Sequence, residues 1–136
     1  MSIGLDNNNP GNIRLSATKY LGEVQLSQNK SFKQFKSMAW GYRAIFVLLH
    51  TYNIRYGLRN IERIINRYAP PTENNTERYI SFVSYRSGIP RDKPIDTLSA
   101  NDMIPIVTAI SRMENGVEAV SEDVNAGWEL FIKHKP

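Results

Sequence analysis

Two short polar motifs near opposite ends of the chain contain residue types that a catalytic or binding site needs. Residues 7–14 read Asn-Asn-Asn-Pro-Gly-Asn-Ile-Arg, and residues 112–116 read Arg-Met-Glu-Asn-Gly. Asn, Pro and Gly in succession favour a turn over a helix, because Asn side chains bond nearby backbone groups and Gly permits positive φ. The amides of such a turn suit a sugar hydroxyl or an N-acetyl group. They suit the protein's own backbone equally well, so both interpretations stay open.

Glu114 has the strongest case for catalysis among the carboxylates. Its spacing from Val107, Ile110 and Ser111 places it at the end of the apolar stripe of its own predicted helix. It also lies in the last turn, where the helix dipole disfavours a negative charge by about 0.3–1 kcal/mol. Both placements favour the neutral carboxyl group, which a general acid needs to protonate a glycosidic oxygen. The alternative is that Glu114 only accepts hydrogen bonds from the loop that follows.

Four other residues have a structural explanation beside the functional one. Glu23 and Glu73 are secondary candidates for the acid, but Glu23 would otherwise form a surface ion pair and Glu73 would cap the helix after it. Tyr68 either directs its phenol into a cleft or belongs to the core. Trp40 either stacks on a sugar ring or fills space in the core.

The composition predicts one domain, residues 1–136, without a metal or a cofactor. A chain of 136 residues can bury a substantial core, and it contains no Cys. The two His residues lie far apart without ligand spacing, and no nucleotide-binding, serine-hydrolase or zinc-protease motif occurs. No segment approaches the roughly 18 apolar residues of a membrane span, and the first twenty residues lack the apolar part of a signal peptide. We therefore expect a soluble chain made in the cytoplasm.

The net charge of +4 is unevenly distributed. Residues 10–70 hold ten Lys and Arg against two Glu, whereas residues 71–136 hold seven against ten acidic residues. A cationic half favours a polyanionic partner, and nucleic acid, anionic lipid and cell-wall polymer all qualify. Nucleic acid is the least expected of these. The basic residues are scattered through predicted core-forming helices and form no Arg-rich recognition helix.

The elements that position these residues are mostly helical. Capping residues, prolines and glycines mark the boundaries of five helices. The helices run from Ser37 to Gly57, from Asn60 to Pro70, from Asn74 or Asn75 to Gly88, from Pro105 to about Glu114, and from Ser121 onward. The first of these is the longest and most apolar, so it should form the centre of the core.

Two local features complete the expected fold. Alternating polar and apolar residues predict a brief strand at 13–15 and a β-hairpin over residues 19–36. Ser99 caps a first turn, but Pro105 lacks the backbone donor that a helix interior requires. We therefore expect the helical path to break at Pro105. The predicted fold class is mainly α, with one small N-terminal hairpin.

Four ordered motifs resemble a known group of phage proteins. They are the turn at 7–14, Trp-Gly-Tyr-Arg-Ala at 40–44, Tyr-Ala-Pro-Pro-Thr-Glu-Asn-Asn-Thr at 68–76, and Glu-Asn-Gly at 114–116. Together they resemble the phage and prophage "structural protein P5" or virion-associated group, whose members are often described as lysozyme-like. The resemblance covers nearly the whole chain. It implies a lysozyme-like helical domain with virion proteins as partners.

A more distant similarity supplies a mechanism. Glucosaminidases of the flagellar-muramidase type have a helix ending in Glu-Ser-Gly, then an Asn-rich segment, a hairpin, a long helix and a Tyr-Ala-Thr-Asp-Pro motif. This chain is similar in order, except that the Glu-bearing helix comes last. The similarity implies a circularly rearranged lysozyme-like domain, in which Glu114 is the catalytic acid and Tyr68 lies opposite it across a cleft. Chain termini often lie close together, which makes such a rearrangement physically feasible.

The sequence and these resemblances together predict an enzyme that cleaves β-1,4 bonds of peptidoglycan, as a muramidase, glucosaminidase or lytic transglycosylase. Glu114 protonates the leaving oxygen, and the substrate's own N-acetyl group serves the second step because no second carboxylate is paired with it. The residues expected to bind the sugar or line the cleft are Asn9, Asn12, Arg14, Trp40 and Tyr68. The alternative is a non-catalytic virion or wall-binding protein with the same scaffold. Either protein would reach the wall in a virion or through another factor.

Overall fold

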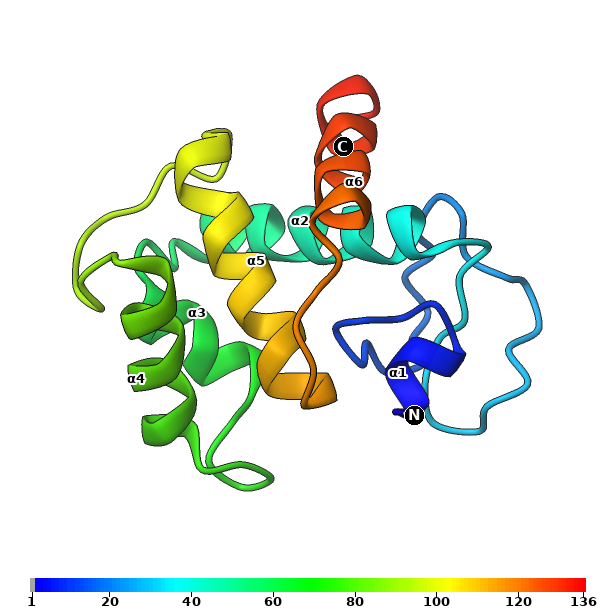
Figure 1. The fold of residues 1–136 in the computed structure, drawn as a ribbon, viewed down its shortest axis with the longest axis horizontal. Helices are drawn as coiled ribbons and strands as arrows, with labels where there is room; N and C mark the ends of the chain where they lie inside the picture. The colour runs from blue at the N-terminus through cyan, green and yellow to red at the C-terminus, as the bar shows by residue number, and fades with distance from the viewer. Residues whose placement is uncertain (1) are drawn as a thin grey trace.

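The computed structural model describes residues 2–136, and these residues form six helices and no strand (Figure 1). The expectation of a mainly helical chain is confirmed. The helices are α1 (Ile3–Asp6), α2 (Met38–Tyr56), α3 (Ile61–Tyr68), α4 (Thr76–Ser87), α5 (Ala100–Asn115) and α6 (Ser121–Lys133). The first is a short turn that the sequence did not indicate.

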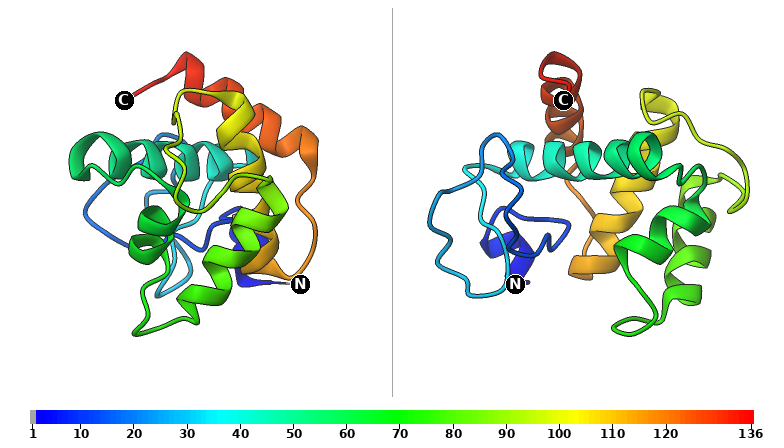
Figure 2. Two further views of the ribbon diagram at one scale, coloured as in Figure 1. Left: turned by 90° about the vertical axis from the view of Figure 1, so that its left-hand side faces the viewer. Right: turned by 180° about the vertical axis from the view of Figure 1, so that it is seen from behind.

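Helix α2 is the central element of the fold. It crosses the molecule behind α5 and α6 in Figure 1, and the turned views of Figure 2 show the other helices and the N-terminal loops arranged around it. Every residue from Gly41 to Val47 is buried, so this part of α2 is enclosed on all sides. A helix enclosed in this way belongs to the core, as its length and composition predicted.

Helix α6 makes the most extensive contact with α2. The two helices approach closely at Gly127, where an added Cβ would lie 2.5 Å from the Cβ of Tyr42 and 3.0 Å from the carbonyl oxygen of Ala39. Beside this crossing, the ring centroids of Phe46 and Trp128 lie 5.0 Å apart. A residue without a side chain therefore brings the two backbones close enough for the aromatic rings to pack.

Replacing Gly127 with Ala should lower the free energy of unfolding by about 1–3 kcal/mol, because the added methyl group meets the backbone of α2. The gain in helix propensity, about 1 kcal/mol, offsets only part of this cost. Denaturant unfolding measures the change. Asn125→Ala, on the exposed side of the same helix, is the control and should change stability by no more than about 0.5 kcal/mol. Equal stability of the two variants would contradict the close crossing.

The capping residues mark the helix boundaries as expected. The side chains of Ser37 and Asn60 accept hydrogen bonds from the first turns of α2 and α3, and Asn75, the second of two candidates, caps α4. Gly57 and Gly88 end α2 and α4 in the left-handed conformation, with φ of 65° and 73°. These boundaries could be located because each rests on a local hydrogen bond or a positive φ.

The expected break at Pro105 is wrong, because α5 continues through it from Ala100 to Asn115. Pro105 lies near the start of this helix, where its missing N–H leaves only the carbonyl of Asn101 without a helical partner. Asn101 is exposed, so water can satisfy that carbonyl. At the last helix, the N-cap is Val120 and not Ser121, which is the first helical residue.

The predicted strand at 13–15 and hairpin over 19–36 are also wrong. Among residues 2–136, the only β-type backbone pairings are isolated antiparallel bridges between Arg14 and Phe32 and between Glu23 and Phe35. Leu26, an apolar residue of the predicted hairpin, is 86% exposed. The segment is instead a long irregular loop closed around a buried charge pair.

That pair is formed by Lys33, whose side chain is fully buried, and Glu23, whose side chain is 4% exposed. The ammonium of Lys33 lies 3.0 Å and 3.1 Å from the two carboxylate oxygens and donates to the carbonyl of Thr18 at 2.8 Å. Glu23 also accepts a hydrogen bond from the backbone N–H of Tyr20. The expected ion pair is present but buried, so Glu23 organises the loop and is not an acid available in a cleft.

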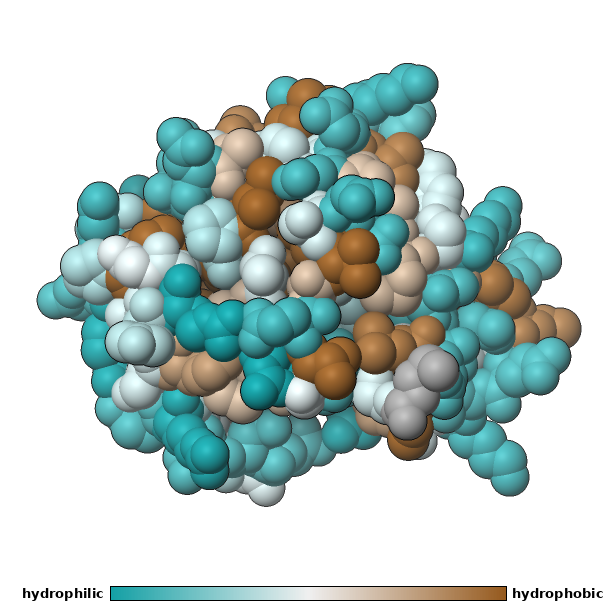
Figure 3. Space-filling view, viewed as in Figure 1, coloured by the Kyte–Doolittle hydropathy of each residue, from teal (hydrophilic) through white to brown (hydrophobic). Residues whose placement is uncertain are grey.

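Within residues 2–136, no helix is long and apolar enough to cross a membrane. The same part of the chain contains no group of three or more acidic, His or Cys side chains placed to bind a metal ion. Polar side chains cover most of the face shown in Figure 3, where apolar residues form small separated patches.

Candidate functional site

The two polar motifs from opposite ends of the chain lie in direct contact. The side-chain amide of Asn12 donates to Oε1 of Glu114 at 2.8 Å, and that of Asn115 donates to the carbonyl of Pro10 at 2.8 Å. The hydroxyl of Ser2 adds a bond to Oδ1 of Asn115 at 2.6 Å. The early turn and the late helix therefore converge in space.

Asn12 adopts the backbone conformation that this contact requires. Its φ is 50°, in the left-handed region that Asn tolerates better than most residues. Its Oδ1 is packed close to Gly4, where an added Cβ would lie 2.6 Å away, and it has no hydrogen-bond partner within residues 2–136. The donor end of the amide is thereby directed at the carboxylate.

Tyr79, on α4, holds the second oxygen of Glu114. The Tyr79 hydroxyl donates to Oε2 of Glu114 at 2.8 Å. Burial and then the nearby Glu114 charge raise the pKa of Tyr79 well above its ordinary value, so the phenol stays protonated and remains a donor. A signal was available, since a buried Tyr normally needs a hydrogen-bond partner for its hydroxyl.

Tyr68 lies at the same site, on α3. Its hydroxyl donates to the carbonyl of Gly11 at 2.5 Å, and burial followed by the Glu114 charge raises its pKa well above the ordinary value. An added Cβ at Gly11 would lie 2.3 Å from this hydroxyl, so only glycine leaves room for the phenol here. Tyr68 and Glu114 line the same cleft.

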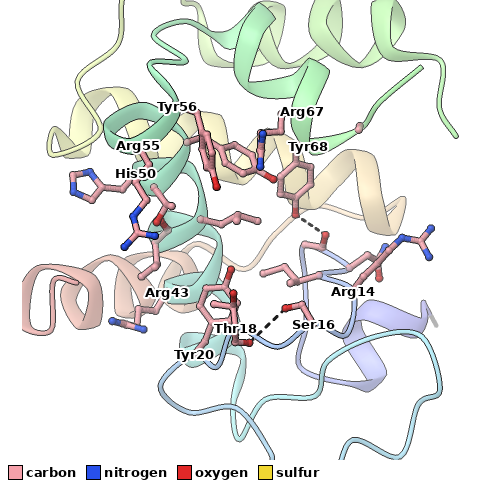
Figure 4. A pocket seen from close by; sticks show the side chains of 18 of the residues that line it. Arg14, Ser16, Thr18, Tyr20, Arg43, His50, Arg55, Tyr56, Arg67 and Tyr68 are labelled. Carbon is pink, nitrogen blue, oxygen red and sulfur yellow. Dashed lines mark hydrogen bonds between the residues drawn. The ribbon is translucent and has the colours of Figure 1, made fainter. Parts of the chain in front are cut away.

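A cleft of about 910 Å³ runs between the N-terminal loop on one side and α2 and α3 on the other. In Figure 4, Tyr56, Arg67 and Tyr68 border it on the helical side, and Thr18 and Tyr20 lie across from them. A smaller hollow of about 270 Å³ lies next to it, lined by α4 and the end of α5. Glu114 and Asn74 line both spaces, so the carboxyl group stands where the two meet.

Arg14 and Glu73 face each other at one end of the cleft. The guanidinium and the carboxylate are 3.5 Å apart, and both side chains are more than half exposed. Arg14 also lies over the ring of Phe32, at 5.5 Å from its centroid. The predicted capping role of Glu73 is wrong, because Asn75 caps α4. Both residues nevertheless line the cleft and remain within reach of a ligand there.

Asn9 and Trp40 have structural roles in place of the predicted contacts with sugar. Asn9 is fully buried, and its amide bonds the N–H and carbonyl of Ile13 and the carbonyl of Lys33, each at 2.9 Å. Trp40 is absent from the cleft lining among the described residues and packs against Gly22, where an added Cβ would lie 2.3 Å from its ring. Asn9 fixes the turn, and Trp40 fills space as the alternative interpretation held.

Replacing Tyr79 with Phe should lower the free energy of unfolding by about 1–3 kcal/mol, because a partly buried carboxylate loses one of two donors. Denaturant unfolding at neutral pH measures the loss. Tyr85→Phe is the matched control on the same helix, since Tyr85 is 85% exposed and should tolerate the change. If the two variants were equally stable, the Tyr79 hydroxyl would not hold Glu114.

Comparison with known proteins places the chain in a phage family. No family model matches it. The chain is 39% identical over 131 residues to "Protein P5" of Pseudoalteromonas phage PM2, an alignment that spans 93% of this chain and 79% of the relative. The match confirms the resemblance to the phage protein group that the four sequence motifs indicated. At this identity and coverage, the chain belongs to the phage protein P5 family.

Proposed function

We propose that this protein cleaves β-1,4 glycosidic bonds in the glycan strands of peptidoglycan, with Glu114 as the general acid. One observation carries the proposal. The Glu114 carboxyl stands at the junction of two hollows, held by Asn12 from the beginning of the chain and by Tyr79 from α4. A carboxyl group placed in a cleft by two fixed partners suits directed proton transfer to a bound substrate.

The two hydrogen bonds support this chemistry in a specific way. In its protonated form, Glu114 would deliver a proton to the oxygen that leaves with one half of the glycan. The carboxylate that remains would then accept from the Asn12 amide and the Tyr79 hydroxyl, which already point at its two oxygens. Donors arranged in advance around a developing charge lower the barrier without having to reorganise.

The second step has no evident carboxylate nucleophile. Glu73 is the other acidic side chain among the described residues that line the main cleft, and it is paired with Arg14. In retaining glycosidases, the group that attacks the sugar is a second carboxylate or the N-acetyl group of the substrate itself. We therefore propose that the N-acetyl group assists, with Arg14 and Asn12 near the bound sugar and Tyr68 in the cleft wall.

The position of Glu114 between two hollows supports a polymeric substrate. A strand that passes over the carboxyl could place sugars in the main cleft on one side and in the smaller hollow on the other. Cleavage would then occur within a strand and need no free end. The unequal volumes, about 910 Å³ and 270 Å³, give more room for sugars on one side of the bond than on the other.

A lysozyme-like scaffold with a rearranged order belongs to the same proposal. In the flagellar-muramidase type, the Glu-bearing helix comes directly before the Asn-rich segment. Here the end of α5 contacts that segment in space through Asn115 and Pro10, although the two are far apart in sequence. This contact supports a circular rearrangement, in which the Glu-bearing helix and the Asn-rich segment remain neighbours in space but are no longer consecutive in the chain. Membership of a phage protein family also supports virion proteins as partners.

A non-catalytic wall-binding or virion protein is the second candidate, and one observation favours it. Both oxygens of Glu114 already accept hydrogen bonds from the protein, so the carboxylate could serve only to join the two ends of the chain. Such a protein would use the same cleft to bind glycan without cutting it. Fold and family alone do not decide between the two candidates.

Incubation of the purified protein with insoluble sacculi separates them. The enzyme should release soluble sugar-containing fragments and lower the turbidity of the suspension as the protein concentration rises. A wall-binding protein should sediment with the sacculi and release nothing above the level of a heat-unfolded sample. If the protein neither sedimented with the sacculi nor released fragments from them, both candidates would be contradicted.

A further inference from the structure

We infer that the cleft contains a carboxylate-binding arm, so that its substrate is a glycan strand that still carries its peptide stems. The cationic arm is the part of the cleft lined by Arg43, Arg55 and Arg67, away from the Arg14–Glu73 pair (Figure 4). This inference rests on the proposed function and specifies its substrate.

The arginines of the cationic arm have no carboxylate partner among residues 2–136. Two other basic residues of the cleft do have one, since Arg14 pairs with Glu73 and Lys19 pairs with Glu23. The ion pairs of the described chain include none of the three arginines of the arm. These three arginines therefore give the cleft lining a positive charge that no side-chain carboxylate within residues 2–136 pairs with, and this charge would attract an anionic group.

Arg67 is held in a defined orientation. Its guanidinium lies 3.9 Å from the ring centroid of Tyr56 and 5.2 Å from that of Tyr52, in the wall of the cleft (Figure 4). Stacking on aromatic rings and a side-chain hydrogen bond with Tyr52 fix the plane of the group, whose five N–H groups outnumber that one partner. A planar edge of this kind matches the two oxygens of a carboxylate, which it can bind in a bidentate manner.

Arg43 adds a charge that no side-chain carboxylate within residues 2–136 pairs with. Its side chain is 4% exposed, and its Nη2 donates to the carbonyl of His134 at 2.6 Å. The buried Nε has no hydrogen-bond partner within residues 2–136. A buried cation without a carboxylate is costly unless something else compensates it, and an anionic ligand in the adjoining cleft would do so.

The chemistry of peptidoglycan offers such a ligand. While the stems are attached, its sugars are uncharged because each lactyl carboxyl group is bound in an amide, whereas the peptide stems on alternate sugars carry free carboxylates. Binding of a bare glycan strand would need hydroxyl, amide and aromatic groups, and these are present in Asn12, Tyr20 and Tyr68. Unpaired arginines would contribute little to a neutral strand. A strand with stems attached would use both kinds of lining, with a stem carboxylate on Arg67.

Binding of two matched glycans tests the inference in a Glu114→Gln background, where cleavage is suppressed. One probe is a soluble glycan fragment with its peptide stems, and the other is a chitooligosaccharide of equal length, which has the same β-1,4-linked N-acetylated sugar backbone and no carboxylate. The fragment with stems should bind about tenfold more tightly at low salt, and added salt should reduce the difference. Arg67→Gln should remove most of this preference and leave binding of the bare glycan unchanged.

The control is Arg63→Gln, an exposed residue on the same helix that does not line the cleft. Arg55→Gln is a second test that disturbs no aromatic stacking, and it should weaken binding of the fragment with stems alone. Equal affinity for the two glycans would overturn the carboxylate site, while release of fragments from sacculi would leave the proposed function intact. If the protein bound the fragment with stems selectively but the wild-type chain cleaved nothing, the carboxylate site would stand and the proposed cleavage would be contradicted.

Nucleic acid is another polyanion, and the same binding assay can test it. A single-stranded oligonucleotide should bind more weakly than the glycan with stems. Tighter binding of the oligonucleotide, lost in Arg67→Gln, would overturn the assignment of the arm to carboxylates, since phosphates would then be its ligands.

Discussion

The variant Glu114→Gln should release soluble fragments from sacculi about 10²- to 10⁴-fold more slowly than the wild-type protein, the range that a general acid contributes. Gln has almost the same shape but no acidic proton to deliver. Its carbonyl can still accept from the Asn12 amide, and its NH₂ can donate to the phenol oxygen of Tyr79. The fold should therefore survive while the chemistry is lost.

Glu129→Gln is the matched control, because it makes the same chemical change at an exposed position on α6. It should cleave at the wild-type rate. Circular dichroism and thermal unfolding of both variants would show that any loss of activity is not a loss of structure. Wild-type activity in Glu114→Gln would contradict the catalytic role and leave Glu114 as a structural contact between the two chain ends.

The second large effect is expected on stability. Replacing Lys33 with Met should lower the free energy of unfolding by about 3–5 kcal/mol, because it leaves the buried carboxylate of Glu23 without its main partner. Typical domains are stable by only about 5–15 kcal/mol, so such a loss is severe. The loop around this pair includes Thr18 and Tyr20, which line the cleft, so binding of glycan should weaken as well.

Denaturant unfolding of Lys33→Met and of the control Lys36→Met, an exposed neighbour, measures this effect. The control should stay within about 0.5 kcal/mol of the wild type. The double variant Lys33→Met with Glu23→Leu should regain part of the lost stability, since no charge is then left buried. A loss below about 1 kcal/mol in Lys33→Met would mean that the pair does not hold the loop together.

The helices could be predicted because their signals are local. Ser37, Asn60 and Asn75 each bond a backbone group three residues ahead, and Gly57 and Gly88 each adopt a positive φ. Such features depend on a few neighbouring residues. They therefore appear in the sequence directly.

The hairpin could not be excluded from the sequence, because its pattern of alternation is real but has another cause. Residues 33 and 35 do point to the same buried side, yet the first of them is Lys33, whose charge is satisfied by Glu23 ten residues earlier. Only the three-dimensional contact shows that a charged side chain is inside. The break at Pro105 was predicted wrongly for a similar reason. The energetic cost of a proline in a helix depends on whether water can reach the carbonyl that loses its partner, and the sequence does not show this.

Two residues of the candidate site, Glu114 and Asn12, could be identified in the sequence by residue type. The contact between them appears only in the structure, because they lie 102 residues apart in the chain. Tyr79 was missed because an aromatic residue at helical spacing looks like core until its hydroxyl is followed to a partner. Asn9 was wrongly expected to bind sugar, because the sequence does not distinguish a buried Asn from an accessible one in the same motif. Burial separates Asn9 from Asn12, which lines the cleft.

The most direct test of the central claim is the mass of the fragments that the wild-type protein releases from purified sacculi. Cleavage by Glu114 in the cleft predicts disaccharide-containing fragments with their peptide stems attached, each with a new glycan end that is either reducing or anhydro. Release of free peptides from intact glycan strands would assign the cut to an amide bond and contradict the account. So would firm binding to sacculi with no soluble product.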